Sequence, residues 1–243
     1  MANTRRALLT ASTALLTLPA GARTFREELP WSPGEVYPAP EARPGGWVFF
    51  TPAEAAMIEA IVDRLIPEDE LGPGGKRAGC AVFIDRQLAG PYGRAEGVYM
   101  QGPFPPNPLP TQGMQSPLTP AQAYREGLRV LADHVARSFG NRRVEQLSAD
   151  ELDRLLGGLE RNEPRLEGAG ARMFDMIYAN TMEGFFADPI YGGNADMAGW
   201  KLLGFPGTRY DYRDVIERPN QRYTMPPVSL AGRPEWRVAG GRG

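Results

Sequence analysis

Three carboxylates lie in the most unusual stretch of the chain, residues 181–207. They are Glu183, Asp188 and Asp196, and aromatic residues lie between and after them. An acid pair among aromatic side chains is what a glycosidase uses, and the same groups suit sugar binding. Asp188-Pro189 is also a turn sequence, in which a carboxylate bonds backbone N–H groups. Both interpretations stay open: the acids either form a site or hold a loop in shape.

Few other residues are typical of catalysis or metal binding. His134, the single histidine, lies beside the apolar stripe of an expected helix, which fits packing better than metal ligation. Cys80, the single cysteine, excludes an internal disulfide, a cysteine-based metal site and a haem-attachment motif. We expect Cys80 to be a small buried residue, with a cross-link to another chain as the alternative. The acidic loop 68–79 lacks the ligand order of an EF-hand.

The short motifs of common enzyme classes are also missing from the sequence. It contains no G-x-S-x-G elbow, no G-x-G-x-x-G after an expected strand and no P-loop lysine pattern. We therefore predict no catalytic residue, no metal site and no cofactor site in this chain.

The stretch 181–207 combines large aromatic residues with residues that interrupt regular structure. Gly or Pro occupies eight positions from Gly184 to Gly207, too many for a regular helix or strand. The aromatic content is too high for a flexible linker. We predict a rigid, packed loop whose residues anchor the loop or bind a partner. The candidates for these two roles are Glu183, Phe185, Phe186, Asp188, Tyr191, Asn194, Trp200 and Phe205.

Around this stretch the sequence predicts helices and no alternating strand pattern. Helix starts are expected at Thr51-Pro52, near Gly79, at Thr119-Pro120, at Ser148 and near Gly168, mostly from capping signals. With 24 Pro and 29 Gly in 243 residues, much of the chain must be loop. The predicted fold is all-α, with about five helices, long irregular Pro/Gly/aromatic loops and extended terminal arms.

Residues 1–22 have the three regions of a signal peptide. The adjacent Arg5 and Arg6 precede an uncharged run from Ala7 to Leu18, and Ala20-Gly21-Ala22 gives a small-x-small cleavage pattern. The arginine pair favours the twin-arginine route, which carries folded proteins to the periplasm. We divide the rest into an N-terminal arm (23–50), a helical domain (51–212) and a C-terminal tail (213–243).

The charge balance argues against two classes of partner. Removing residues 1–22 takes away two of the 27 basic residues and none of the 29 acids, so the net charge goes from −2 to −4. No basic patch is visible, which makes nucleic acid an unexpected partner. No second apolar run approaches ~18 residues, so no membrane span is predicted.

The run from Glu183 to Gly207 resembles the signature of the gluconate 2-dehydrogenase subunit 3 family. The segment Phe83-Ile-Asp-Arg-Gln-Leu-Ala-Gly-Pro-Tyr-Gly93 and the twin-arginine start resemble this family as well, and the resemblance covers about residues 51–212. It implies a small, or gamma, subunit of a bacterial flavin-dependent dehydrogenase that acts on a sugar, polyol or sugar acid. Such a subunit has no cofactor and no catalytic residue of its own.

The resemblance also implies which proteins the chain associates with. The catalytic partner is expected to be a large FAD-binding subunit of the glucose-methanol-choline type, and a cytochrome c subunit often accepts the electrons. The small subunit is expected to assist maturation, stability and twin-arginine export of the large one. Two alternatives remain from the residues: a periplasmic sugar-binding protein or carbohydrate-active enzyme that uses Glu183 and Asp188, and a cytoplasmic assembly chaperone.

Overall fold

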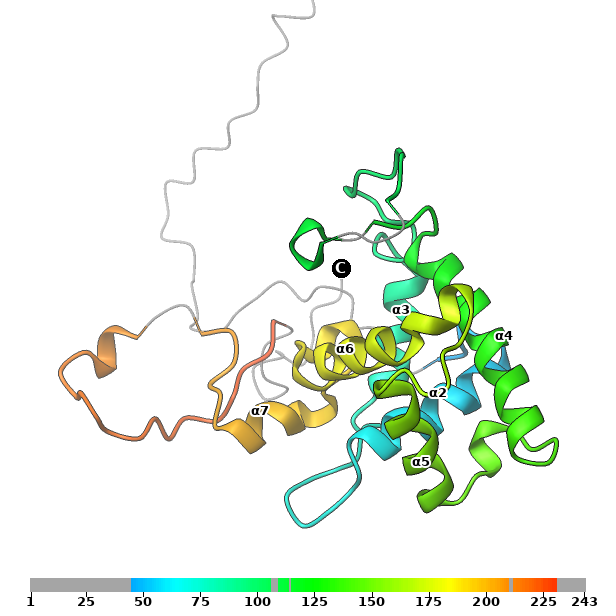
Figure 1. Ribbon diagram of the computed structural model, residues 1–243. Helices are drawn as coiled ribbons and strands as arrows, with labels where there is room; N and C mark the ends of the chain where they lie inside the picture. The colour runs from blue at the N-terminus through cyan, green and yellow to red at the C-terminus, as the bar shows by residue number, and fades with distance from the viewer. Residues whose placement is uncertain (1–44, 106–108, 114, 210–211, 231–243) are drawn as a thin grey trace, which may run out of the picture. The chain divides into compact units, whose positions relative to one another are not determined.

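A computed structural model describes residues 45–105, 109–113, 115–209 and 212–230 (Figure 1). The predicted signal peptide, the predicted arm up to residue 44 and the last part of the predicted tail (231–243) lie outside the described residues. No helix in the described part is both long and apolar enough to cross a membrane.

The described residues are helical, which confirms the all-α prediction. The six α-helices among them are α2 (Pro52–Leu65), α3 (Cys80–Ala89), α4 (Pro120–Ser138), α5 (Ala149–Glu160), α6 (Met173–Phe186) and α7 (Ala198–Leu203). Short 3₁₀ turns lie between them, and the described residues contain no strand beyond two isolated β-bridges.

One detail of the stretch 181–207 differs from the sequence expectation: the short helix α7 was not expected. Helix α6 enters the stretch and ends at Phe186. Thr181 and Phe185 face the core, and the Thr181 hydroxyl donates to the Ile177 carbonyl oxygen at 2.6 Å. Gly184 does not interrupt α6; it lies against the side chain of Phe83, and a Cβ atom there would lie 3.0–3.1 Å from that side chain, closer than an ordinary contact. Here tertiary packing outweighs local helix propensity.

Three helices begin with the predicted capping box. The side chains of Thr51, Thr119 and Ser148 each accept from the backbone N–H three residues on, and a Glu or Gln at that position bonds back. In α2 and α4 a proline follows the cap, where its missing N–H costs nothing. Each cap satisfies backbone N–H groups that have no partner within the helix.

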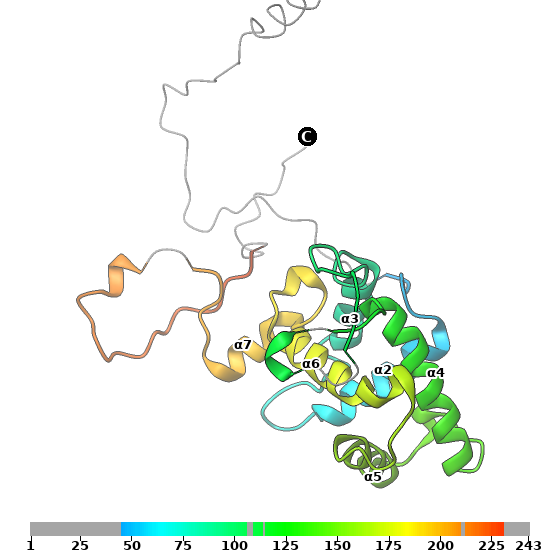
Figure 2. The same cartoon turned by 45° about the horizontal axis from the view of Figure 1, so that its top comes forward.

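The core lies where α2 meets α3, α5 and α6 (Figure 2). Helix α4 packs against the 3₁₀ turn Gly168–Arg172 and against α6. The largest fully buried side chain is Tyr124 of α4, whose phenol donates to Asn180 Oδ1 at 2.7 Å. That bond gives the buried Tyr124 hydroxyl a partner where α4 packs against α6.

A buried carboxylate fastens the segment before α2 to α3. Asp85 of α3 is fully buried and accepts the backbone N–H groups of Val48, Phe49 and Phe50 at 2.8–2.9 Å. The adjacent Arg86 forms an ion pair with the same carboxylate. Because every oxygen of Asp85 has a partner, the cost of burying the charge is offset and Phe50 is held in the core.

Candidate partner-binding site

The segment that follows α6 is folded around one buried amide. Asn194 is fully buried; its Nδ2 donates to the Ala187 carbonyl oxygen at 2.7 Å, and its Oδ1 accepts from the Gly199 N–H at 2.8 Å. These bonds close the turns between α6 and α7. The backbone of Asn194, Asp196 and Met197 adopts positive φ angles, which non-glycine residues rarely do. Asn194 thus holds a strained connection in a single shape.

Two glycines of this segment are required by close backbone contact. A Cβ atom on Gly193 would lie 2.1 Å from the Gly184 carbonyl oxygen, and one on Gly199 would lie 2.3 Å from the Phe185 carbonyl oxygen. Both distances are impossible for a real side chain, so any larger residue would push α7 off the end of α6. The two glycines are therefore needed for tight packing of the backbone and not for flexibility.

Two of the predicted aromatic residues anchor the segment to the core. Phe185 and Trp200 are buried, and Trp200 Nε1 donates to the Phe186 carbonyl oxygen at 2.7 Å. That carbonyl lies at the end of α6, where the helix supplies no partner of its own. The Trp200 indole therefore ties α7 to α6 by packing and by a hydrogen bond.

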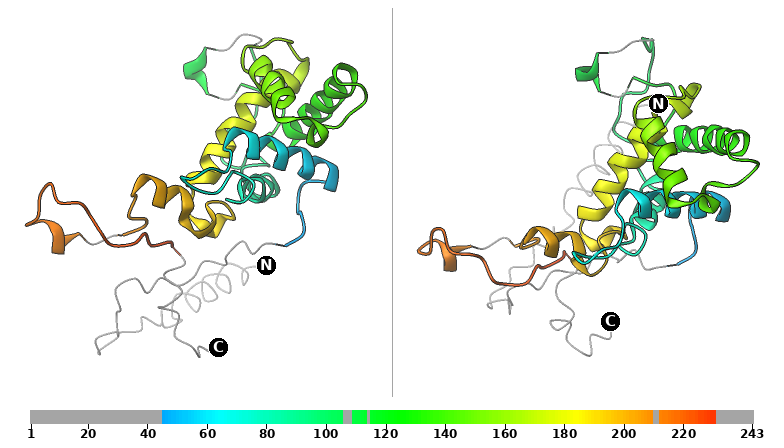
Figure 3. Two further views of the ribbon diagram at one scale, coloured as in Figure 1. Left: turned by 90° about the horizontal axis from the view of Figure 1, so that it is seen from below. Right: turned by 60° about the horizontal axis from the view of Figure 1, so that its bottom comes forward.

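Other large apolar residues of the same segment point to solvent. Phe186, Tyr191, Leu202, Leu203 and Phe205 are 38–66% exposed. They come from the end of α6, the turn Pro189–Tyr191, α7 and the residues just after it (Figure 3), and we call them the α7 face. Five exposed large apolar side chains between residues 186 and 205 of one structured segment indicate an interaction surface more strongly than single residues scattered along the chain do.

A groove adjoins the α7 face. It has a volume of about 520 Å³ and lies between the acidic loop 68–73 and α7, with Asp196, Lys201 and Leu202 on the α7 side. Leu71, which is 70% exposed, lines the opposite wall. Leu71 and Leu202 lie among six charged residues of the lining, a composition nearer to the polar rim of a protein interface than to its apolar centre; these six are Glu68, Asp69, Glu70, Arg77, Asp196 and Lys201.

Asp188 holds a distant part of the chain against the segment. Its Oδ1 accepts from the Ile190 N–H at 3.1 Å and from the Ser229 hydroxyl at 2.7 Å, and its Oδ2 accepts from the Leu230 N–H at 2.7 Å. Asp188 is buried, and both carboxylate oxygens have partners within the chain. A carboxylate held in this way positions backbone and is not free to act as a base or nucleophile.

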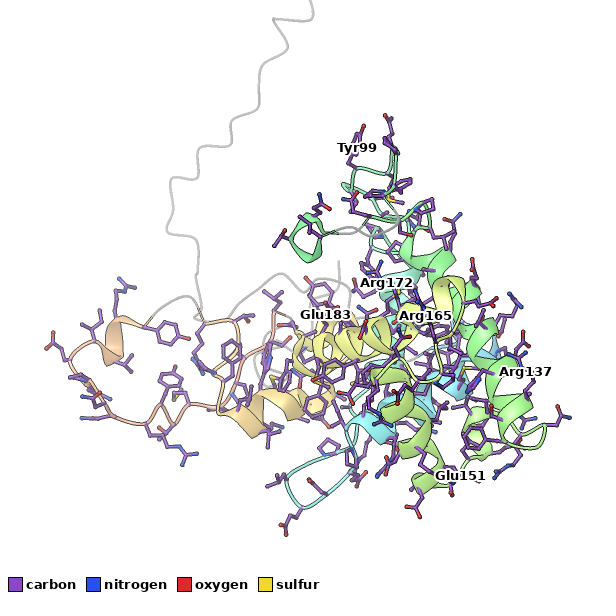
Figure 4. The ribbon with its side chains drawn as sticks, in the orientation of Figure 1. Tyr99, Arg137, Glu151, Arg165, Arg172 and Glu183 are labelled. Atoms are coloured by element: carbon purple, nitrogen blue, oxygen red, sulfur yellow. The ribbon has the colours of Figure 1, made fainter. Side chains whose placement is uncertain are left out.

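Unlike the buried Asp188, Glu183 is exposed on the surface of α6 (Figure 4). Its Oε2 accepts from Asn180 Nδ2 at 2.9 Å, and Asn180 Oδ1 accepts from Tyr124 and, at 3.4 Å, from Tyr92. Burial raises the pKa of both phenols, that of Tyr124 well above its ordinary value. The tyrosines stay protonated at neutral pH and act as hydrogen-bond donors, so the network orients side chains.

A second cavity, of about 530 Å³, opens near this network. Tyr92, Leu118, Ala123 and Met176 contribute to its mostly apolar wall, and Arg172 lines it as well. Its size is within the range of small-molecule sites. None of the eight residues predicted from the stretch 181–207 lines it.

His134 and Cys80 lie outside the segment. His134 is half-buried on α4; burial and the nearby Arg137 lower its pKa, so it is neutral at pH 7. Cys80 is fully buried, and burial raises the pKa of its thiol to about 12. Its sulfur is therefore an unreactive part of the core in this fold. Among the residues that the structure describes, no three His, Cys, Asp or Glu side chains are grouped to hold a metal ion.

One protein family is recognised in the chain. The family model described as gluconate 2-dehydrogenase subunit 3 matches residues 52–207, which is more than half of the chain and runs from α2 to just past α7. The chain belongs to the gluconate 2-dehydrogenase subunit 3 family. A member of this family is one subunit of a dehydrogenase complex, which implies a catalytic partner subunit. No curated protein and no solved structure shows significant similarity to the chain.

Sequence reasoning missed several residues that organise or form this surface. Leu202 and Leu203 were not singled out, because α7 was not expected. Only when a helix has been predicted can its residues be assigned to a side that faces solvent. Asp85 and Asn180 were also missed. A polar residue among apolar neighbours on a helix, as at Asp85 beside Ile84 and Phe83, is the signal that could have identified it.

Proposed function

We propose that this chain is the non-catalytic small subunit of an exported, FAD-dependent dehydrogenase of the glucose-methanol-choline type. The observation that carries the proposal is the α7 face: apolar side chains held outward by a rigid segment within the family-matched region. Asn194 and Trp200 hold the segment in place, so the exposed Leu202 and Leu203 are not required for its folding. Their exposure is explained by contact with another protein, and the family supplies a catalytic subunit as that protein.

The oxidation of substrate belongs to the partner in this proposal. The substrate is a sugar or sugar acid, and the FAD lies in the large subunit. A cytochrome c subunit would take the electrons onward. The small subunit stabilises the large one and assists its maturation, which requires a large interface of the obligate kind, on the order of 2,000 Å² or more.

The alternative, a self-sufficient carbohydrate-active enzyme, has less support. It needs Asp188 and Glu183 as a working carboxylate pair. Asp188 is buried with both oxygens engaged by Ile190, Ser229 and Leu230. Glu183 is the only one of the two that is exposed. Turnover or binding of a sugar by the purified chain alone would favour this alternative.

Purification from the native host tests the main proposal. The tagged wild-type chain is expected to co-purify with a flavoprotein that contains FAD and oxidises a sugar or sugar acid with an artificial electron acceptor. The variant Leu202→Ser with Leu203→Ser should retain its fold, because both side chains are exposed. We expect its affinity for the flavoprotein to fall at least ~10-fold, a loss of about 1.4 kcal/mol.

The matched control replaces exposed apolar residues far along the chain from α7. Tyr99, which lies on the loop before α4 (Figure 4), and Leu109 are 75% and 63% exposed. Tyr99→Ser with Leu109→Ser is expected to leave complex formation unchanged. A large subunit that is fully active and exported in cells lacking this chain would refute the proposed function.

Export forms a separate part of the proposal. Arg5→Lys with Arg6→Lys should leave both this chain and its large partner in the cytoplasm, because the pair would travel as one folded complex. Cell fractionation followed by an activity assay measures this. Normal export of the large subunit alongside the twin-lysine variant would contradict joint export while leaving the complex itself unchallenged.

A further inference from the structure

The chain makes a closed loop after α7, and its two ends meet at a short neck. Gly207 and Val228 form an isolated parallel bridge. The Thr208 N–H donates to the Val228 carbonyl oxygen at 2.7 Å, and the Val228 N–H donates to the Pro206 carbonyl oxygen at 3.2 Å. We call the described residues 208–209 and 212–227 the C-terminal loop; the family match ends where this loop begins.

The neck is built for a fixed geometry. Gly207 has a φ of +78°, and a Cβ atom there would lie 2.2 Å from the Val228 carbonyl oxygen. Just beyond the bridge, the buried Asp188 carboxylate holds Ser229 and Leu230. Gly207, Val228 and Ser229 are buried. The Gly207–Val228 bridge therefore holds the two ends of the loop together, and the Asp188 carboxylate holds them against the segment that carries the α7 face.

The loop itself buries almost nothing. From residue 212 to residue 226, no side chain whose burial is described is buried. Tyr212, Ile216 and Met225 are 39–67% exposed. Its internal contacts include the 3₁₀ turn Arg213–Val215, a ring contact between Tyr212 and Tyr223, and Arg209, which lies over the Tyr223 ring and donates from Nη2 to the Pro226 carbonyl oxygen at 2.9 Å. A loop of this length without regular structure is usually functional or unstructured, and a clamped neck favours the first.

The surface area needed for a stable complex supports the same conclusion. At about 200 Å² for each large side chain, the exposed fractions of the α7 face amount to about 500 Å². The interface of about 2,000 Å² proposed above takes about 1,000 Å² from each partner, of which roughly 600 Å² is apolar. The same conversion gives the three apolar residues of the C-terminal loop about 300 Å², which makes up the difference. The loop is also continuous with the α7 face, because only Pro206 and Gly207 separate Phe205 from it.

We propose that the C-terminal loop is a second contact arm, which binds the same catalytic subunit as the α7 face. This inference rests on the proposed function. Ile216 and Met225 enter apolar hollows of the partner, and the exposed Arg218 and Arg222 lie beside acidic groups at their edges. Because the loop lies beyond the family-matched residues, it gives this chain a contact of its own that selects its particular partner.

The test compares dissociation of the purified two-subunit complex on serial dilution, measured by size-exclusion chromatography. One variant is Ile216→Ser with Met225→Ser. A second replaces residues 212–225 with a short Gly-Ser linker and leaves the neck intact. Both are expected to weaken the complex at least ~10-fold while circular dichroism of the free chain stays that of the wild type. The matched control, Tyr99→Ser with Leu109→Ser, is expected to dissociate like the wild type.

The outcomes separate this inference from the proposed function. If both loop variants bind within twofold of the wild type, while Leu202→Ser with Leu203→Ser does not, the arm is refuted and the proposed function stands. If the wild-type chain itself captures no flavoprotein, both are refuted. Weakening by the serine pair and by the linker together, with the control unchanged, supports the arm.

Discussion

Two buried aspartates, both inside the family-matched region, fasten segments of the chain that lie before and after that region. Asp85 accepts three backbone N–H groups from residues 48–50, and Asp188 accepts two N–H groups and a hydroxyl from Ile190, Ser229 and Leu230. Each ties a segment outside the helices to the helical core. Such charge-assisted bonds are stronger than neutral ones, so either aspartate can fix a segment that has no regular structure.

We call Asp85 and Asp188, each with its hydrogen-bond partners, the two clamps. They differ in whether the segment that they hold is buried or exposed. The segment at Asp85 carries Phe50 into the core, where it packs against the ring of Tyr124. The segment at Asp188 closes the neck of a loop whose side chains stay in solvent. The first clamp therefore adds to the free energy of unfolding through apolar burial. The Asp188 clamp instead positions an exposed surface, so we expect it to contribute to the affinity for the partner more than to the free energy of unfolding.

Asp85→Ala should have the largest effect on stability. It leaves the backbone N–H groups of residues 48–50 without this acceptor, removes the ion-pair partner of Arg86 and releases Phe50. We expect a loss of about 3 kcal/mol or more, which corresponds to a fall of roughly 10 °C in the melting temperature. Thermal unfolding followed by circular dichroism measures this.

The control is Asp133→Ala on α4. Asp133 is exposed and pairs with Arg129 at 3.1 Å, one turn earlier. Such surface pairs contribute about 0.3–0.5 kcal/mol, so the melting temperature should hardly change. Equal effects of Asp85→Ala and Asp133→Ala would show that the first clamp does not stabilise the core.

Asp188→Ala should have an intermediate effect on stability and a large local one. It removes the acceptor for Ser229 and Leu230, at a cost of about 1–2 kcal/mol, and the neck of the C-terminal loop then rests on the Gly207–Val228 bridge. Trypsin should cleave within residues 209–222 several-fold faster, while the melting temperature falls by only a few degrees.

Ser229→Ala is the matched control for this clamp. It removes only the hydroxyl, and the Leu230 N–H still bonds Asp188, so cleavage should stay closer to the wild-type rate. If Asp188→Ala instead melts as early as Asp85→Ala, the two clamps serve the same purpose and the contrast between them is wrong.

The helix starts could be predicted because their causes are local. Thr51, Thr119 and Ser148 form capping boxes with residues three positions on, and these pairs are visible in the sequence. Helix α7 could not be predicted in this way. Gly193 and Gly199 look like interruptions, but their reason is contact with the backbone of α6, which a sequence does not display.

The position of the candidate site could be predicted from the sequence, but the role of each of its residues could not. Aromatic content placed it in residues 181–207, yet Trp200 is buried and Phe205 beside it is exposed. Both are large aromatic residues, so composition alone cannot separate an anchor from a contact residue. The clamp between Asp188 and Leu230 spans 42 positions, and only the folded chain brings the two together.

Glu151→Gln should have the smallest effect, and it contrasts the two buried aspartates with a half-buried glutamate. Glu151 lies in the first turn of α5 and pairs with Arg142 from the segment before that helix; the hydrogen bonds from Arg142 lower its pKa to about 2. Because the folded pKa lies below the unfolded value of about 4.3, this pair stabilises the fold above that value and is lost as the pH falls toward 2. The melting temperatures of Glu151→Gln and wild type should differ slightly at pH 7, converge below pH ~4 and coincide near pH 2. A difference that stays constant over this range would mean that the ion pair makes no contribution.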